Sequence, residues 1–134
     1  MNYWIIKTEP STYSWDDLRK EQITKWTGVR NFQARNNLKE MNSNDICLFY
    51  HSGTEKMIIG KCFVHSNYYQ DPTTNDTNWV AVDIKAGEKL KKTVKLEQIK
   101  NSPLLSNIGL IKQTRLSVIK ITENEYLNII KLSE

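Results

Sequence analysis

Apolar residues along this chain fall into short runs that alternate with polar residues, which is the pattern of β-strands with one buried face. Turn-forming residues bound the runs, among them Pro10, the 42–45 cluster Asn-Ser-Asn-Asp, and Asp71-Pro72. Gly60 inside one run predicts a bulge or a close approach of another group to the backbone. Strands are predicted at residues 3–8, 46–50, 57–65, 79–84 and 115–121, and residues 86–94 either extend the fourth or form another.

Capping signals between these runs predict helices. Ser14-Trp-Asp-Asp17 and Thr122-Glu-Asn-Glu125 are capping boxes, which open helices over 15–20 and from 123 onward. The last helix is expected to turn Tyr126, Leu127, Ile129 and Ile130 inward. Shorter helical segments are predicted at 96–99 and from Ser102-Pro103 to an end at Gly109.

Residues 26–36 hold the densest mixture of chemistry in the chain, Trp-Thr-Gly-Val-Arg-Asn-Phe-Gln-Ala-Arg-Asn. We expect a loop, turned at Gly28, that enters a helix over 32–41 capped by Asn31. Ala34, Leu38 and Met41 then form the buried face of that helix. The arginines near a helix N-terminus favour an anion, and Trp26 offers a flat surface for a base. The alternative is that Trp26 is an ordinary core residue and that the arginines are a solvated face.

The length and composition fit one globular domain over residues 1–134. Short strands with interspersed helices predict an α+β fold, a small mixed β pseudo-barrel of about five to six strands with flanking helices. The net charge of +4 permits a phosphate-bearing partner without requiring one. No apolar run approaches ~18 residues and no basic segment opens the chain, so neither a membrane span nor a signal peptide is expected, and the location should be cytoplasmic.

The two cysteines, Cys47 and Cys62, each lie inside an apolar run. We expect reduced core residues on strands rather than a disulfide. Two cysteines and two distant histidines do not favour a zinc site, and no cofactor is expected.

Six blocks in order along the chain resemble the EVE domain family. They are YWIIKTEP at 3–10, residues 26–36, LFYHS at 48–52, YQDP at 69–72, WVAVD at 79–83 and RLSV at 115–118. The resemblance implies a PUA-like fold close to YTH and ASCH domains. It also implies non-enzymatic binding of a modified base in DNA or RNA, held in an aromatic pocket as YTH domains hold a methylated base.

The chain departs from the family in two loops. Many EVE domains carry a longer insertion before the tryptophan of the fifth block, where only residues 73–78 remain here. The turn after LFYHS is also altered, to Gly-Thr-Glu-Lys-Met at 53–57. If the insertion normally walls the pocket, this chain has a more open site.

The resemblance and the residue types together suggest roles in a base-binding pocket. Trp26 is the first stacking candidate, and Tyr50 and Trp79 are possible further walls. Side chains expected at the base edge or the pocket wall are Thr8, Glu9, Val29, Arg30, Asn31, Gln33 and His51, and Arg30, Arg35 and Arg115 are the candidates for phosphate.

Simpler interpretations stand beside several of these roles. Asn31 can be a helix cap alone, and Arg35 can be paired with a buried carboxylate such as Asp83. Lys7 fits a strand lysine with a solvated head, and Trp4 and Trp15 fit the core.

Two rival functions use the same residues. The first is a sensor of a nucleoside or other small molecule without a polynucleotide. The second is an enzyme in which His51, Glu9 and Asp71 perform acid–base chemistry. No nucleophile motif or glycine-rich phosphate loop accompanies these residues, so we expect no catalytic residue.

Overall fold

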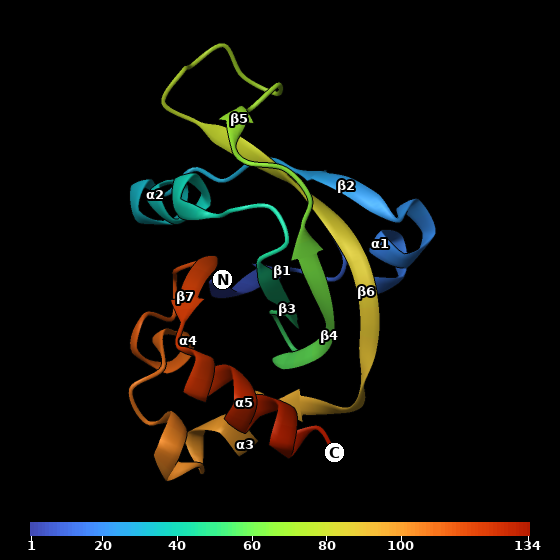
Figure 1. The fold of residues 1–134 in the computed structure, drawn as a ribbon, viewed down its shortest axis with the longest axis vertical. Coiled ribbons are helices and arrows are strands. Elements are labelled where there is room, and N and C mark those ends of the chain that lie inside the picture. The colour runs from blue at the N-terminus through green and yellow to red at the C-terminus, as the bar shows by residue number, and fades with distance from the viewer.

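A computed structural model describes residues 1–134, and its centre is one mixed sheet (Figure 1). The strands are β1 Tyr3–Thr8, β2 Ile23–Trp26, β3 Ile46–His51, β4 Met57–Val64, β5 Tyr69–Gln70, β6 Val80–Lys95 and β7 Val118–Ile121. The helices are α1 Trp15–Glu21, α2 Phe32–Glu40, α3 Leu96–Lys100, a 3-10 turn η1 Pro103–Leu105, α4 Gly109–Lys112 and α5 Glu123–Leu132.

The strand order is β2-β6-β4-β3-β1-β7, with β5 added to β6. Only β1 and β3 run parallel, and every other pair is antiparallel. The long strand β6 curves along one side of the molecule and carries β2 and β5 near one end (Figure 1). The α+β class is confirmed. The sheet has seven strands and does not close into a barrel, because β2 and β7, at the two ends of the strand order, do not pair with each other.

The sequence pattern missed two short strands of this sheet. Residues 23–26, expected to lead into a loop, form β2 against β6, with Trp26 opposite Val82. Residues 69–70, expected within a polar loop, form β5. Residues 86–94 extend β6 and do not return as a separate strand.

The capping predictions are confirmed. Ser14 and Thr122 form capping boxes at α1 and α5, and the Asn31 side chain accepts a hydrogen bond from the Ala34 N–H at 2.9 Å. The prediction that a helix from Ser102-Pro103 ends at Gly109 is wrong, because η1 ends at Leu105 and Gly109 begins α4. The prediction that Leu127 faces inward is also wrong, because this side chain is 53% exposed, while Ile129 on the same helix α5 is fully buried.

The core lies between the sheet and the helices and includes Trp4 and Trp15, as predicted. Gly60 interrupts the register of β4 with both neighbouring strands. A Cβ at Gly60 would lie 2.4 Å from Cη2 of the Trp15 indole, so the predicted close approach is confirmed. Cys47 and Cys62 are opposite each other on β3 and β4, buried and free.

The helices gather at two places around the sheet. Helix α2 packs on β7 and β6, while α3, η1, α4 and α5 collect at the end of the molecule farthest from β5 (Figure 1). None of these helices is both long and apolar enough to cross a membrane. The cytoplasmic location stays a prediction.

Candidate base-binding cavity

A cavity of about 400 Å³ opens where the end of β1 meets β2 and the loop that follows it. We call it the Trp26 cavity. Its lining residues are Lys7, Thr8, Thr12, Tyr13, Thr24, Lys25, Trp26, Thr27, Gly28, Val29, Arg30 and Ser117. Four residues predicted for base binding line it: Thr8, Trp26, Val29 and Arg30. The volume lies toward the lower end of the roughly 300–1,000 Å³ typical of small-ligand sites.

Trp26 is both a core residue and a cavity wall, so the two interpretations of it hold together. It is 9% exposed and packs edge-on against Phe49, with 5.8 Å between ring centroids. Tyr13 meets Trp26 at 90° and 6.0 Å and also lines the cavity. Burial, together with a hydrogen bond to Glu21, raises the pKa of the Tyr13 hydroxyl to about 12. Tyr13 therefore stays an uncharged aromatic wall at neutral pH.

The polar lining of the cavity is rich in donors. Lys7 donates one hydrogen bond from Nζ to the Thr114 carbonyl at 2.8 Å, and its ammonium group retains two further protons. Half-burial lowers the Lys7 pKa from its ordinary value. Thr8 Oγ1 already donates to the Tyr13 carbonyl at 2.9 Å. A ligand with acceptor atoms toward Lys7 would satisfy donors that the protein itself leaves available.

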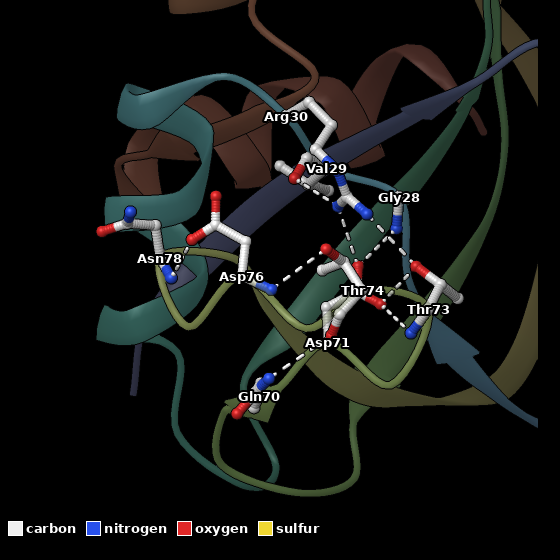
Figure 2. A network of polar contacts seen from close by, with 9 residues as sticks. All are labelled: Gly28, Val29, Arg30, Gln70, Asp71, Thr73, Thr74, Asp76 and Asn78. Carbon is white, nitrogen blue, oxygen red and sulfur yellow. Dashed lines mark hydrogen bonds and ion pairs between the residues drawn. The ribbon is translucent and has the colours of Figure 1, made fainter.

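The loop from Gly28 to Arg30 is held by Asp71, whose side chain is fully buried (Figure 2). One carboxylate oxygen accepts from the Gly28 N–H at 2.8 Å and from Arg30 Nη1 at 3.0 Å. The other oxygen accepts from the Thr73 N–H at 2.8 Å and from Thr73 Oγ1 at 2.6 Å. Burial alone would raise the pKa of this carboxyl, but the hydrogen bonds from Thr73, Gly28 and Arg30 outweigh it and hold the pKa far below its usual range.

The candidates Asn31, Gln33 and Arg115 lie together at another place, a shallow hollow of about 310 Å³. Asn31 caps α2 there, and Gln33 Nε2 donates to Gln113 Oε1 at 2.8 Å. Arg115 lines the hollow without a carboxylate partner. The structure does not bring these three residues to the lining of the Trp26 cavity.

Tyr50 and Trp79 are not among the lining residues either. Tyr50 is buried, with the Lys7 ammonium 5.8 Å from its ring centroid. Trp79 packs instead on Phe32, at 4.9 Å between ring centroids. Arg35 is not paired with Asp83, whose carboxylate accepts a hydrogen bond from the Tyr69 hydroxyl. The Arg35 guanidinium donates instead to the Asn36 side chain and to the Asn78 carbonyl.

The proposed acid–base residues are engaged in separate structural tasks. His51 Nε2 accepts the Trp15 N–H at 3.0 Å, so the ring proton belongs on Nδ1, which faces Glu55 Oε1 at 2.9 Å. Glu9 accepts from the N–H and hydroxyl of Ser11, both at 3.2 Å, and neither His51 nor Glu9 lines the cavity. None of the three proposed acid–base residues, His51, Glu9 and Asp71, lines the cavity.

Several residues of the cavity were missed from the sequence, among them Thr24 and Tyr13, and so was the role of Asp71 in holding its loop. Thr24 lines the cavity because it lies two residues before Trp26 on β2 and shares its face. The alternating pattern of Ile-Thr-Lys-Trp was the available signal. Tyr13 precedes a helix cap, and Asp71 lies 43 residues beyond Gly28, so no local pattern connected either to the cavity.

The comparisons with known proteins cover almost the whole chain. The EVE domain model matches residues 2–132. Thymocyte nuclear protein 1 from Mus musculus is 32% identical over 168 residues, which covers 99% of this chain and 74% of that protein. The crystal structure of a protein from Agrobacterium tumefaciens has a TM-score of 0.95 at 38% identity and covers 99% of this chain and 93% of its own.

Human THYN1 protein has been solved in complex with DNA that contains 5-methylcytosine. It has a TM-score of 0.92 and 27% identity to this chain, and the match covers 100% of this chain and 98% of that one. The elements that surround the Trp26 cavity therefore belong to a fold that these proteins share along nearly its full length.

Proposed function

Because this chain belongs to the EVE domain family, we propose that it binds a modified base in DNA, holds that base in the Trp26 cavity and performs no reaction on it. The observation that carries the proposal is the cavity itself, which combines aromatic walls with unused donors. The complex of the human relative with DNA that contains 5-methylcytosine supports DNA and a methylated cytosine as the first ligand to test.

The energetics favour recognition by shape. Extruding a base from a duplex costs a few kcal/mol, and stacking on an aromatic side chain returns about 1–3 kcal/mol per base. Burying one methyl group adds only about 0.8 kcal/mol. Discrimination between a methylated and an unmethylated base therefore depends on how closely Trp26, Tyr13 and Val29 enclose the methyl group.

Polar contacts supply the orientation. Lys7 can donate to a base carbonyl or ring nitrogen, because its ammonium retains protons after the bond to Thr114. Arg30 lies at the rim but is already paired with Asp71, so it is a weaker candidate for phosphate than the unpaired Arg35 and Arg115. With few such cations, the salt dependence of binding should be shallow.

The test is fluorescence anisotropy of labelled single-stranded DNA and RNA pentamers that carry one central cytosine or 5-methylcytosine. A cavity-filling variant, Ser117→Phe, should lower affinity for the methylated DNA about tenfold or more, because it removes the space for stacking. Ser106→Phe, at an exposed position away from the cavity, is the matched control. Trp26→Phe tests the wall itself and is preferable to Trp26→Ala, which would cost the core about 3–5 kcal/mol.

Each outcome has one meaning. Equal affinity of Ser117→Phe and the unmodified protein would refute the cavity as the base site. Equal affinity for methylated and unmethylated DNA would refute modified-base recognition. Tight binding of free 5-methyl-2′-deoxycytidine without salt dependence would favour the nucleoside sensor, since a polynucleotide reader loses affinity as salt rises.

A further inference from the structure

A row of two stacked aromatic rings with an arginine at each end begins at the rim of the Trp26 cavity. The Arg30 guanidinium lies 5.6 Å from the Trp79 ring centroid, the Trp79 and Phe32 rings are 4.9 Å apart, and the Arg35 guanidinium lies 5.0 Å from the Phe32 centroid. We call these four residues the rim stack. Arg30 comes from the loop before α2, Phe32 and Arg35 from α2 itself, and Trp79 from the residue just before β6.

Packing of the core does not explain Phe32. It is 58% exposed, at the first position of α2, where a polar residue would serve the helix equally well. Ala34 and Leu38 already form the buried face of this helix. An exposed ring flanked by cations is the surface that unpaired bases prefer, because every base has a π-face and the backbone is anionic.

The arginines of the rim stack are fixed before any ligand arrives. Arg30 is held by Asp71 and by Thr73 Oγ1 at 3.2 Å, and Figure 2 shows its guanidinium reaching across to the loop that contains these two residues. Arg35 is held by the Asn36 side chain at 2.8 and 3.1 Å and by the Asn78 carbonyl at 3.3 Å. A preorganised surface of this kind loses little side-chain entropy on binding.

Arg30 joins the two sites, because it lines the Trp26 cavity and also covers Trp79. A strand whose base occupies the cavity has its next nucleotide within reach of this rim. We propose that the rim stack binds the nucleotide adjacent to the held base on the same strand, with its base against Phe32 and its phosphate near Arg35. This inference rests on the proposed function and adds a second contact for the same ligand.

The experiment isolates stacking from charge. Two single-stranded DNA pentamers carry the same central 5-methylcytosine; one has thymines beside it, and the other has abasic sites, which keep every phosphate. Anisotropy titrations should show the unmodified protein binding the thymine-flanked pentamer about fivefold or more tightly. Phe32→Ala should bind both pentamers with nearly the same affinity, while Phe32→Tyr keeps the difference.

The controls separate this inference from the proposed function. Leu127→Ala removes another exposed apolar side chain, on α5, and should keep the full preference for thymine flanks. The inference is overturned if Phe32→Ala keeps that preference or if the unmodified protein lacks it. In either case a retained preference for 5-methylcytosine over cytosine leaves the proposed function standing, whereas loss of that preference in the unmodified protein refutes the proposed function itself.

Discussion

Replacing Asp71 with asparagine tests whether this buried carboxylate holds the cavity together. The carboxylate accepts four hydrogen bonds, two of them from the backbone N–H groups of Gly28 and Thr73. An asparagine keeps one acceptor oxygen, and its NH₂ group must face either the Gly28 N–H and Arg30 or the N–H and hydroxyl of Thr73. An unsatisfied buried N–H costs about 1–3 kcal/mol. The lost ion pair adds at most about 1 kcal/mol, because the Arg30 side chain is 40% exposed.

Asp71→Asn should therefore lower the free energy of unfolding by about 1–4 kcal/mol. The unfolding entropy of about 2.1 cal/mol/K per residue, over 134 residues, is about 0.28 kcal/mol/K, so Tm should fall by roughly 4–14 °C at pH 7. Urea titration and thermal circular dichroism measure both quantities. Asp76→Asn is the matched control in the same loop, because Asp76 is exposed and accepts only the Asn78 N–H.

The sign of the pH dependence provides an independent check. The Asp71 pKa is far below its ordinary value of 3.8 in the folded protein, so its stabilisation is fully present above that value. The stabilisation is lost as pH falls from there toward the folded pKa. The difference in free energy of unfolding between the unmodified protein and Asp71→Asn should thus decrease as the pH falls from 5 to 2. An Asp71→Asn protein with unchanged Tm at pH 7, or a constant difference across this range, would refute the reasoning.

Two further substitutions test the structural assignments. His51→Ala should lower the free energy of unfolding by about 1–3 kcal/mol, because the Trp15 N–H loses its acceptor, and should leave affinity for 5-methylcytosine DNA unchanged; a specific loss of binding at unchanged stability would return His51 to the site. Gly60→Ala should cost about 1–3 kcal/mol in urea unfolding, because the new Cβ would lie 2.4 Å from the Trp15 ring; wild-type stability would show that the indole has room to move.

Elements with their own local signals were predictable from the sequence. The alternating run of β1 and the capping boxes of α1 and α5 contain the information that fixes them. Strand β2 was missed because its four residues alternate too briefly, and its only partner, β6, lies about sixty residues later. Gly109 and Leu127 were misassigned because both a helix stop and a helix face depend on what packs against them.

The site was predictable in its chemistry and less so in its arrangement. Trp26 and Arg30 were identified by residue type and both line the cavity, while Asn31 and Gln33, only a few positions further, lie at another hollow. The division follows from the turn at Gly28 and the start of α2, which point successive side chains in different directions. Asp71, which fixes that turn, acts across 43 residues and leaves no trace in the local pattern.

The short 73–78 loop bears on how open the site is. None of its residues lines the Trp26 cavity, yet Thr73 anchors Asp71 and Arg30 (Figure 2). Hydrogen bonds within the loop also support it, since Thr74 Oγ1 accepts from the Asp76 N–H at 3.1 Å and the Asp76 carboxylate accepts from the Asn78 N–H at 2.9 Å. Beside this short loop, Phe32 is 58% exposed. Under the proposed function, the cavity and the rim stack both contribute to affinity for a strand, so the loss of either one should be measurable.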